Sequence, residues 1–167
     1  MKRFIGIGLA TAVALALVAS VATAANSRSA VKVTSLVASY KGRATTQQSD
    51  TRVDILAKGT GAGNVIGAGT ISGVGVSDSS VQPCPPLTGT GKLTGTAGTT
   101  LVFKVNAGSK ACGDEQGEEF SVVGTATLTK GTGKFKLAKG VLRFTGSYSR
   151  GSGDFSVKFT GKVTTPK

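Results

Sequence analysis

Four of the eight acidic residues lie close together, and they form the densest group of side chains that could do chemistry. They are Asp114, Glu115, Glu118 and Glu119. Neighbouring carboxylates can bind Ca²⁺ or share acid–base work, but the ligand spacing of an EF-hand is absent. The chain has no histidine, so it can form neither a Ser-His-Asp triad nor a Cys-His pair. We therefore expect a hydrated loop here and predict no metal site and no cofactor.

The stretch KGTGKFKLAKG (residues 130–140) combines closely spaced glycines with a Gly-Lys pair, as phosphate-binding loops do. Such a loop needs Ser or Thr after Gly-Lys, whereas Phe135 follows Lys134 here. The dinucleotide fingerprint fails as well, because Lys136 occupies its third glycine position. The stretch is therefore predicted to be a turn between strands. Phe135 and Leu137 are expected to point into the core, and Lys134 and Lys136 into water.

The elements that must position these residues are predicted to be strands. Apolar and polar residues alternate at short spacing, and glycine (25 residues) is frequent, which favours strands joined by tight turns over helices. The pattern predicts an all-β domain of eight antiparallel strands, which could form a sandwich or a closed barrel. Closure removes exposed sheet edges, and glycines inside strands suit the bends of a barrel, so a single eight-stranded antiparallel barrel is favoured. The predicted strands cover residues 31–40, 52–58, 64–76, 87–96, 99–107, 119–130, 141–149 and 154–163.

The first 24 residues have the three parts of a secretory signal peptide: a positive start, an apolar run and the sequence Ala-Thr-Ala at 22–24. The alternative is an uncleaved membrane anchor. Cleavage would leave a flexible lead (25–30) and one barrel domain (31–165), with no membrane-spanning segment. The predicted location is extracellular or periplasmic.

Two cysteines, Cys84 and Cys112, remain in the exported chain. In an oxidising compartment they are expected to form one disulfide. A cross-link at this spacing stabilises a fold by about 3–4 kcal/mol.

Positive charge is concentrated at the C-terminal end of the sequence. Residues 130–167 contain nine basic residues and one acidic residue. Arg143, Lys158 and Lys162 are predicted to share the outer face of two neighbouring strands, where they could bind an acidic envelope polymer. Nucleic-acid binding is not favoured, because stacking aromatic residues are scarce on that face.

Three segments together resemble plant dirigent proteins and related allene oxide cyclase-type barrels, including small secreted bacterial members. They are KGTGKFKLAKGVLRFTGSY, RVDILAK and DFSVKFTGKV. The resemblance implies an eight-stranded antiparallel barrel whose cavity, in dirigents, holds phenoxy radicals or quinone methides, with assistance from acids and an arginine. Asp54 would match the first-strand aspartate. Lys139 would stand in place of the arginine, and Lys134 where some members have an acid.

Three functions are compatible with these observations. The first is a non-enzymatic protein that binds a small apolar or aromatic ligand in a lumen lined by Val122, Phe144 and Phe155. The second is binding of an acidic polymer by the basic face. The third is a dirigent- or cyclase-like enzyme that uses Asp54, although this residue could instead face outward beside Arg52. The sequence ranks them in this order and leaves open whether the protein forms a homo-oligomer.

Overall fold

The computed structural model describes residues 30–167, so the expected signal peptide lies outside the described part of the chain. All eight predicted strands are present, and one short strand is additional. Within residues 30–167, no helix is long and apolar enough to cross a membrane. The elements are β1 (Val31–Ser49), β2 (Arg52–Gly63), β3 (Gly67–Asp78), β4 (Leu87–Thr94), η1 (Thr96–Gly98), β5 (Thr100–Val105), β6 (Lys110–Gly113), β7 (Glu119–Gly131), η2 (Gly133–Phe135), β8 (Val141–Ser149) and β9 (Asp154–Pro166).

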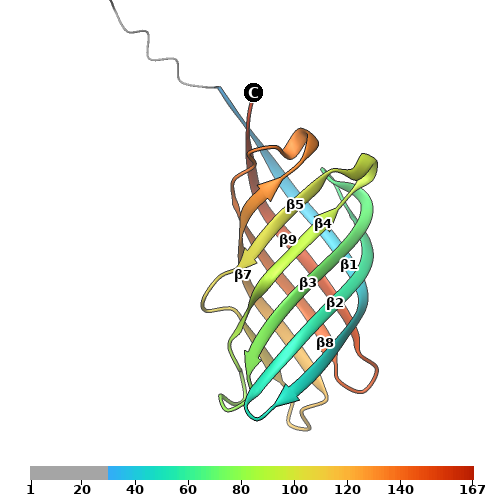
Figure 1. The fold of residues 1–167 in the computed structure, drawn as a ribbon, viewed down its shortest axis with the longest axis vertical. Coiled ribbons are helices and arrows are strands. Elements are labelled where there is room, and N and C mark those ends of the chain that lie inside the picture. Colours follow the sequence, from blue (N-terminus) through green and yellow to red (C-terminus); the bar gives the residue numbers. More distant parts are fainter. Residues whose placement is uncertain (1–29) are drawn as a thin grey trace, which may run out of the picture.

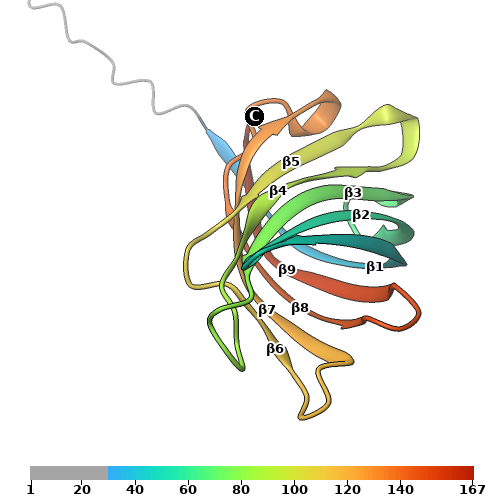
Figure 2. The same cartoon turned by 60° about the horizontal axis from the view of Figure 1, so that its bottom comes forward.

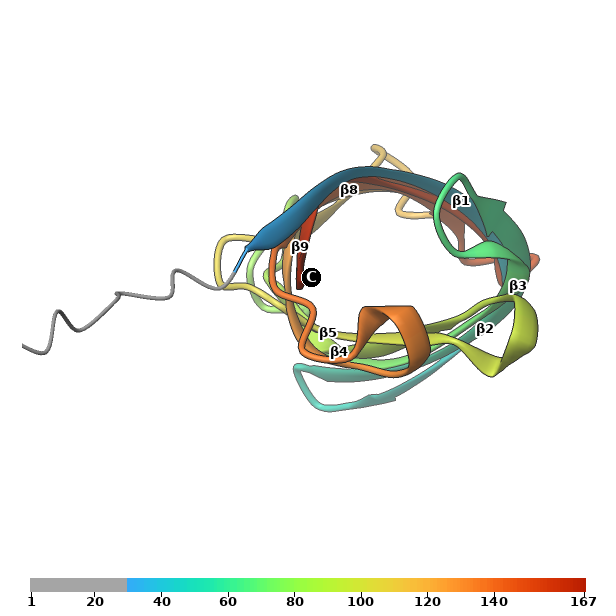
Figure 3. The ribbon, with the colours of Figure 1, turned by 90° about the horizontal axis from the view of Figure 1, so that it is seen from above.

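The strands close into an eight-stranded antiparallel barrel (Figures 1 and 3). Neighbours pair in the order β5-β4-β3-β2-β1-β9-β8-β7-β6, and a pairing of β5 with β7 closes the sheet. β5 and β6 share one position in the wall, because β5 pairs with residues 126–131 of β7 and β6 with residues 120–123. The predicted fold class is confirmed. We call the end with the β1–β2 and β8–β9 turns the lower end, as in Figure 1, and the opposite end the upper end.

The strands are strongly tilted, because the pairing is staggered around the barrel. We start at Leu36 of β1 and move from each residue to its paired residue on the next strand, first to Gly161 of β9 and then around the barrel. The path returns to β1 at Thr46, ten residues further on. An eight-stranded barrel with tilted strands has an interior that is either filled by its own side chains or occupied by one small ligand. The side chains inside the barrel decide between these two cases.

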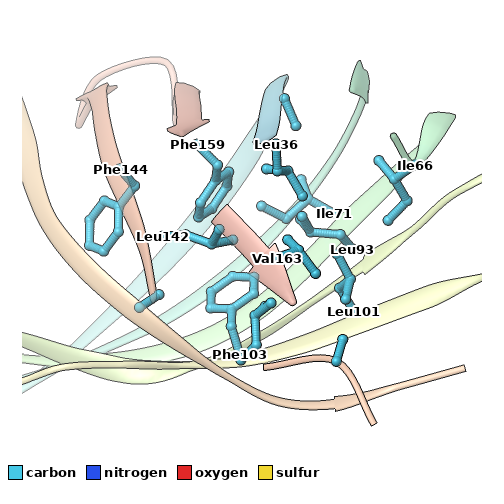
Figure 4. Packing of buried hydrophobic residues seen from close by; sticks show 14 of the residues in the cluster. Leu36, Ile66, Ile71, Leu93, Leu101, Phe103, Leu142, Phe144, Phe159 and Val163 are labelled. Carbon is cyan, nitrogen blue, oxygen red and sulfur yellow. The ribbon is translucent and has the colours of Figure 1, made fainter. Parts of the chain in front are cut away.

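Apolar side chains fill the upper half of the barrel (Figure 4). Phe159 lies at the centre of an aromatic group: its ring centroid is 5.3 Å from that of Phe103, 6.0 Å from that of Phe144 and 6.5 Å from that of Tyr40. Fully buried aliphatic side chains surround this group, and they include Leu36, Leu93, Leu101, Leu128, Leu142 and Val163. This half of the barrel is a packed core.

The stretch 130–140 is a turn that covers the upper end, as predicted. Phe135 in η2 is only 5% exposed and plugs the barrel. Leu137, which was expected in the core, is 65% exposed, so that prediction is wrong. The reason is local: Leu137 has a φ of +61°, which breaks the alternation of side chains that an extended strand would impose.

The predicted disulfide joins Cys84 to Cys112, with an S–S distance of 2.06 Å. It lies where the barrel wall contains its shortest strand, β6. The segment before β4 runs alongside β6, and the amides of Ala111 and Gly113 donate hydrogen bonds to the carbonyls of Pro85 and Pro83. We call the place where β5 and β6 pair with β7 and close the barrel the seam. The disulfide therefore fastens the segment before β4 to β6 in the lower part of the seam.

The acidic cluster follows this seam, between β6 and β7. The Asp114 carboxylate accepts a hydrogen bond of 2.9 Å from the amide of Glu118, which closes a turn. No group of three or more His, Cys, Asp and Glu side chains within the described residues is arranged to hold a metal ion.

Candidate functional site

Below the packed core, inward-facing apolar side chains are partly accessible from the lower end of the barrel. Side chains alternate along a strand, and the pairing registers show which residues point inward. In the upper half the inward apolar side chains are buried, whereas in the lower half they are only half-buried. We call the half-buried set the lower cup, and it contains Val53, Ile55, Leu87, Phe120, Val122, Tyr148, Phe155 and Val157.

Glycines line the lumen between the core and the lower cup. The stagger of the strands brings inward glycines of six strands to similar heights; this glycine belt is formed by Gly42, Gly59, Gly73, Gly89, Gly124 and Gly146. A Cβ atom added to Gly73 would have only backbone atoms of Thr90 and Gly91 within 4 Å. At Gly124, by contrast, it would touch Ser109 and the Phe144 ring, and at Gly59 it would touch the Phe155 ring. The belt therefore accommodates aromatic rings at Gly124 and Gly59, whereas no side chain lies within 4 Å of a Cβ atom added to Gly73.

Aromatic and polar groups surround the lower mouth, which Figure 2 brings forward. The ring centroids of Phe120 and Tyr148 are 6.0 Å apart, and the Arg150 guanidinium lies 5.1 Å from the Phe120 centroid. The hydroxyl oxygens of Tyr148 and Thr46 are 3.5 Å apart. These two residues belong to β8 and β1, which are separated by β9, so this contact spans part of the mouth. The cup is thus apolar inside and polar at its rim.

Tyr40 points into the lumen at the border between the core and the glycine belt. It pairs with Val157 of β9 and Gly61 of β2, and it is 1% exposed. Its hydroxyl has no hydrogen-bond partner among the described residues. Burial raises the pKa of the Tyr40 phenol, so this hydroxyl is neutral and can donate a hydrogen bond at physiological pH.

The three predicted ligand-binding residues point inward from neighbouring strands. Val122 (β7) and Phe155 (β9) belong to the lower cup, whereas Phe144 (β8) belongs to the core. Sequence reasoning did not identify Tyr40 as a lumen residue. The sequence did contain a signal for this position. The alternate residues after Tyr40 are the small residues Gly42 and Ala44, so the alternation continues beyond the predicted strand 31–40.

No protein-family model matches the sequence, and no curated protein matches it. Solved structures that match the fold include the pterocarpan synthase dirigent proteins GePTS1 and PsPTS1. Both superimpose with a TM-score of 0.52 at 14% sequence identity; the match covers 82% of this chain and 92% of GePTS1, and 81% of this chain and 97% of PsPTS1. The chain has the dirigent-type barrel fold. The resemblance noted in the sequence is thus confirmed at the level of fold.

In this dirigent-type barrel, the residues carried over from the resemblance do not line the lumen. Asp54 faces outward, because the residues of β2 that face the lumen are its odd-numbered ones. The Arg52 guanidinium lies 2.7 Å from the Asp54 carboxylate, and its hydrogen bonds lower the pKa of Asp54. Lys134 and Lys139 are exposed and belong to the stretch that covers the upper end. The outward position of Asp54 is the alternative that the sequence left open.

The basic residues lie on the outer wall of the barrel. Arg143 of β8 pairs with Thr160 of β9, which places it between Lys158 and Lys162, about 7–8 Å along each diagonal. All three side chains are exposed. The ion pairs found among residues 30–167 are Arg43–Asp154 and Arg52–Asp54, and none of the three cations takes part in them.

Proposed function

We propose that this dirigent-type barrel is a non-enzymatic binding protein that holds one small apolar or aromatic ligand in its lower lumen. The lower cup carries the proposal: its apolar side chains point inward and are only half-buried, although inward positions of a self-filled barrel are buried. The glycine belt adds room above the cup where the Phe144 and Phe155 rings do not cover it, as beside Gly73. Ligand sites are usually concave and mostly apolar, with a few polar groups that fix orientation, and this description fits the cup and its rim.

The chemistry of the wall favours binding over catalysis. The lower cup contains no carboxylate, lysine or arginine. The titratable groups that it and the adjacent wall provide are the phenols of Tyr40 and Tyr148. Acid–base catalysis at neutral pH is most efficient with groups whose pKa lies near 7, whereas the pKa of an ordinary phenol is about 10. Asp54, the candidate base of the enzymatic alternative, is outside the barrel.

Two adjacent valines provide a matched test of the proposal. Val122 points into the lower cup, whereas Val123 points outward and is 37% exposed. Val122→Trp places an indole in the lumen, and we expect it to weaken binding of the neutral fluorescent probe N-phenyl-1-naphthylamine by about tenfold or more, since about 1.4 kcal/mol of lost contact has this effect. Val123→Trp is expected to leave the affinity unchanged. Isothermal titration calorimetry measures both.

Equal loss of affinity in both variants would contradict binding in the lumen. Binding that survives Val122→Trp would do the same, provided that circular dichroism shows both variants to be folded. A wild-type protein that binds no probe would remove the proposed function altogether.

A second candidate function is attraction of an acidic polymer to the outer wall, and the three unpaired cations of β8 and β9 favour it. We expect the triple variant Arg143→Gln, Lys158→Gln and Lys162→Gln to bind poly-L-glutamate about tenfold more weakly at low salt, because three exposed contacts of a few tenths of a kcal/mol each are lost. Added salt should weaken wild-type binding as well.

The matched control removes three cations elsewhere on the wall: Lys92→Gln, Lys104→Gln and Lys110→Gln, all exposed positions. Its net charge equals that of the first triple variant. If both triple variants lose the same affinity, net charge alone attracts the polymer and the basic residues of β8 and β9 are not a site.

A further inference from the structure

The charged side chains of the barrel are separated along its axis. Each of the eight acidic residues lies in a loop at the lower end or among the three residues of a strand nearest that end. The upper end has exposed basic side chains instead, on the stretch 130–140 and on the adjoining parts of β8 and β9. We call them the basic cap: Lys130, Lys134, Lys136, Lys139, Arg143 and Lys162.

The basic cap has no counter-charge within the barrel. Both ion pairs found among residues 30–167 use carboxylates of the lower end, Asp54 and Asp154. Clustered like charges repel one another, and they create a positive potential that attracts anions. The upper end therefore favours an anionic partner.

An exposed leucine lies in the middle of the basic cap. Leu137 is 65% exposed, more than any other large apolar side chain of the described residues. It directly follows Lys136 and precedes Lys139 by two positions. Lys139 pairs with Thr164 of β9, whose other neighbour is the exposed Val33 of β1. Apolar and basic side chains are thus interspersed at the upper end (Figure 1).

The turn holds Leu137 outward in a defined conformation. Its neighbours Phe135 and Ala138 are buried, and the amide of Ala138 donates a hydrogen bond of 2.9 Å to the carbonyl of Phe135. Residues with a side chain seldom adopt a positive φ such as that of Leu137. Folding therefore does not account for a leucine here, because its side chain does not pack and its backbone conformation is disfavoured. An external apolar partner does account for it.

An anionic lipid bilayer combines both properties of the expected partner. Surface-bound proteins bury apolar side chains at the headgroup boundary, while lysines bury their stems and keep their ammonium groups among the headgroups. Clustered lysines and arginines attract anionic lipids. The direction of the chain agrees, because β1 begins at the upper end and the apolar run of residues 4–19 precedes it in the sequence.

We propose that the upper end of the barrel is a membrane-docking surface. The basic cap binds the phosphate groups of anionic lipids, and Leu137 inserts its side chain at the boundary between headgroups and acyl chains. Docking in this way turns the lower mouth away from the bilayer and toward the aqueous phase. The inference is independent of ligand binding in the lumen.

A matched pair of leucine variants tests the insertion. The barrel closes with residues 30–167 alone, so residues 25–167 are used and the N-terminal apolar run cannot itself bind lipid. Sedimentation with vesicles of equal parts phosphatidylglycerol and phosphatidylcholine measures affinity. We expect Leu137→Asn to bind about fivefold more weakly, because part of the apolar burial of leucine is lost. Asparagine tolerates positive φ. Leu56→Asn, at an outer-wall leucine of β2 that is 45% exposed, should bind as the wild type does.

A matched pair of charge variants tests the basic cap. The triple variant Lys134→Gln, Lys136→Gln, Lys139→Gln is expected to bind these vesicles about a hundredfold more weakly, the effect of three lysines near an anionic surface. The control Lys41→Gln, Lys104→Gln, Lys110→Gln has the same net charge and removes exposed lysines outside the cap, and it should lose less than about tenfold. Pure phosphatidylcholine vesicles should not bind the wild type.

The contrary outcomes are distinguishable. If the two triple variants lose the same affinity, net charge alone attracts the vesicles and the upper end is not a docking surface. If Leu137→Asn binds as the wild type does, no side chain inserts and the proposal fails. If the wild type binds poly-L-glutamate but not the vesicles, the partner is an acidic polymer and membrane docking is wrong. None of these results affects probe binding in the lumen.

Tryptophan fluorescence gives a readout of insertion itself. The chain has no tryptophan, so Leu137→Trp and Leu56→Trp each contain a single indole. Vesicles with phosphatidylglycerol should move the emission of Leu137→Trp to shorter wavelength, and brominated acyl chains should quench it. The emission of Leu56→Trp should not change. Emission of Leu137→Trp that is unaltered by bound vesicles would show that the turn stays outside the bilayer and would overturn the proposal.

Discussion

Replacing Phe159 with alanine is expected to lower the free energy of unfolding by about 3–5 kcal/mol, the cost of deleting a buried aromatic ring. The Phe159 ring contacts three aromatic partners, Tyr40, Phe103 and Phe144, and it is 3% exposed. The surrounding wall cannot collapse into the space, because a closed barrel fixes the distances between its strands. Urea denaturation followed by circular dichroism measures the change.

Phe155→Ala is the matched control, four residues earlier on the same strand and with the same inward direction. Phe155 is only half-buried in the lower cup, so its deletion removes less packing. We expect Phe155→Ala to lower the free energy of unfolding by less than half as much as Phe159→Ala does. We also expect it to weaken the binding of N-phenyl-1-naphthylamine more than Phe159→Ala does. Equal destabilisation by the two variants would mean that the lower half is packed as tightly as the upper half, which contradicts the account of an open cup.

The second large effect is expected from the disulfide. The double variant Cys84→Ser, Cys112→Ser should lose about 3–4 kcal/mol of stability, since the cross-link restricts the unfolded chain over a separation of 28 residues. Chemical denaturation of the double variant and the wild type, both without reductant, measures this difference.

Reductant provides the control for the disulfide prediction. It should destabilise the wild type to about the level of the double variant and leave the double variant unchanged. Because the bond fastens the loop before β4 to β6 at the lower seam, we also expect probe binding to weaken on reduction. A reduced wild type with unaltered stability would show that the hydrogen bonds of this seam hold it without the cross-link.

Much of the fold could be predicted from the sequence because alternation determines which way a strand residue points. The pattern from Phe155 to Val163 predicts inward aromatic residues and outward lysines, and the structure has both. The eight strands and the disulfide were predicted for similar local reasons. Leu137 shows the limit: a single residue with positive φ reverses the direction of its side chain, and nothing in its type signals this conformation.

The candidate site depends on the arrangement of distant strands, and this could be predicted only in part. Val122 and Phe155 were expected to line a lumen, and both point into it. The glycine belt was not foreseen, because it exists only when a ten-residue stagger brings Gly42, Gly73 and Gly146 to similar heights. For the same reason the isolation of the Tyr40 hydroxyl is not readable from its neighbours in sequence.

The most direct test of the central claim is a crystal structure of the oxidised protein grown with N-phenyl-1-naphthylamine. The account predicts one probe molecule inside the barrel, with its rings against lower-cup residues such as Val122 and Phe155. A lower lumen filled by the protein's own side chains, with the probe absent or bound only on the outer wall, would contradict it.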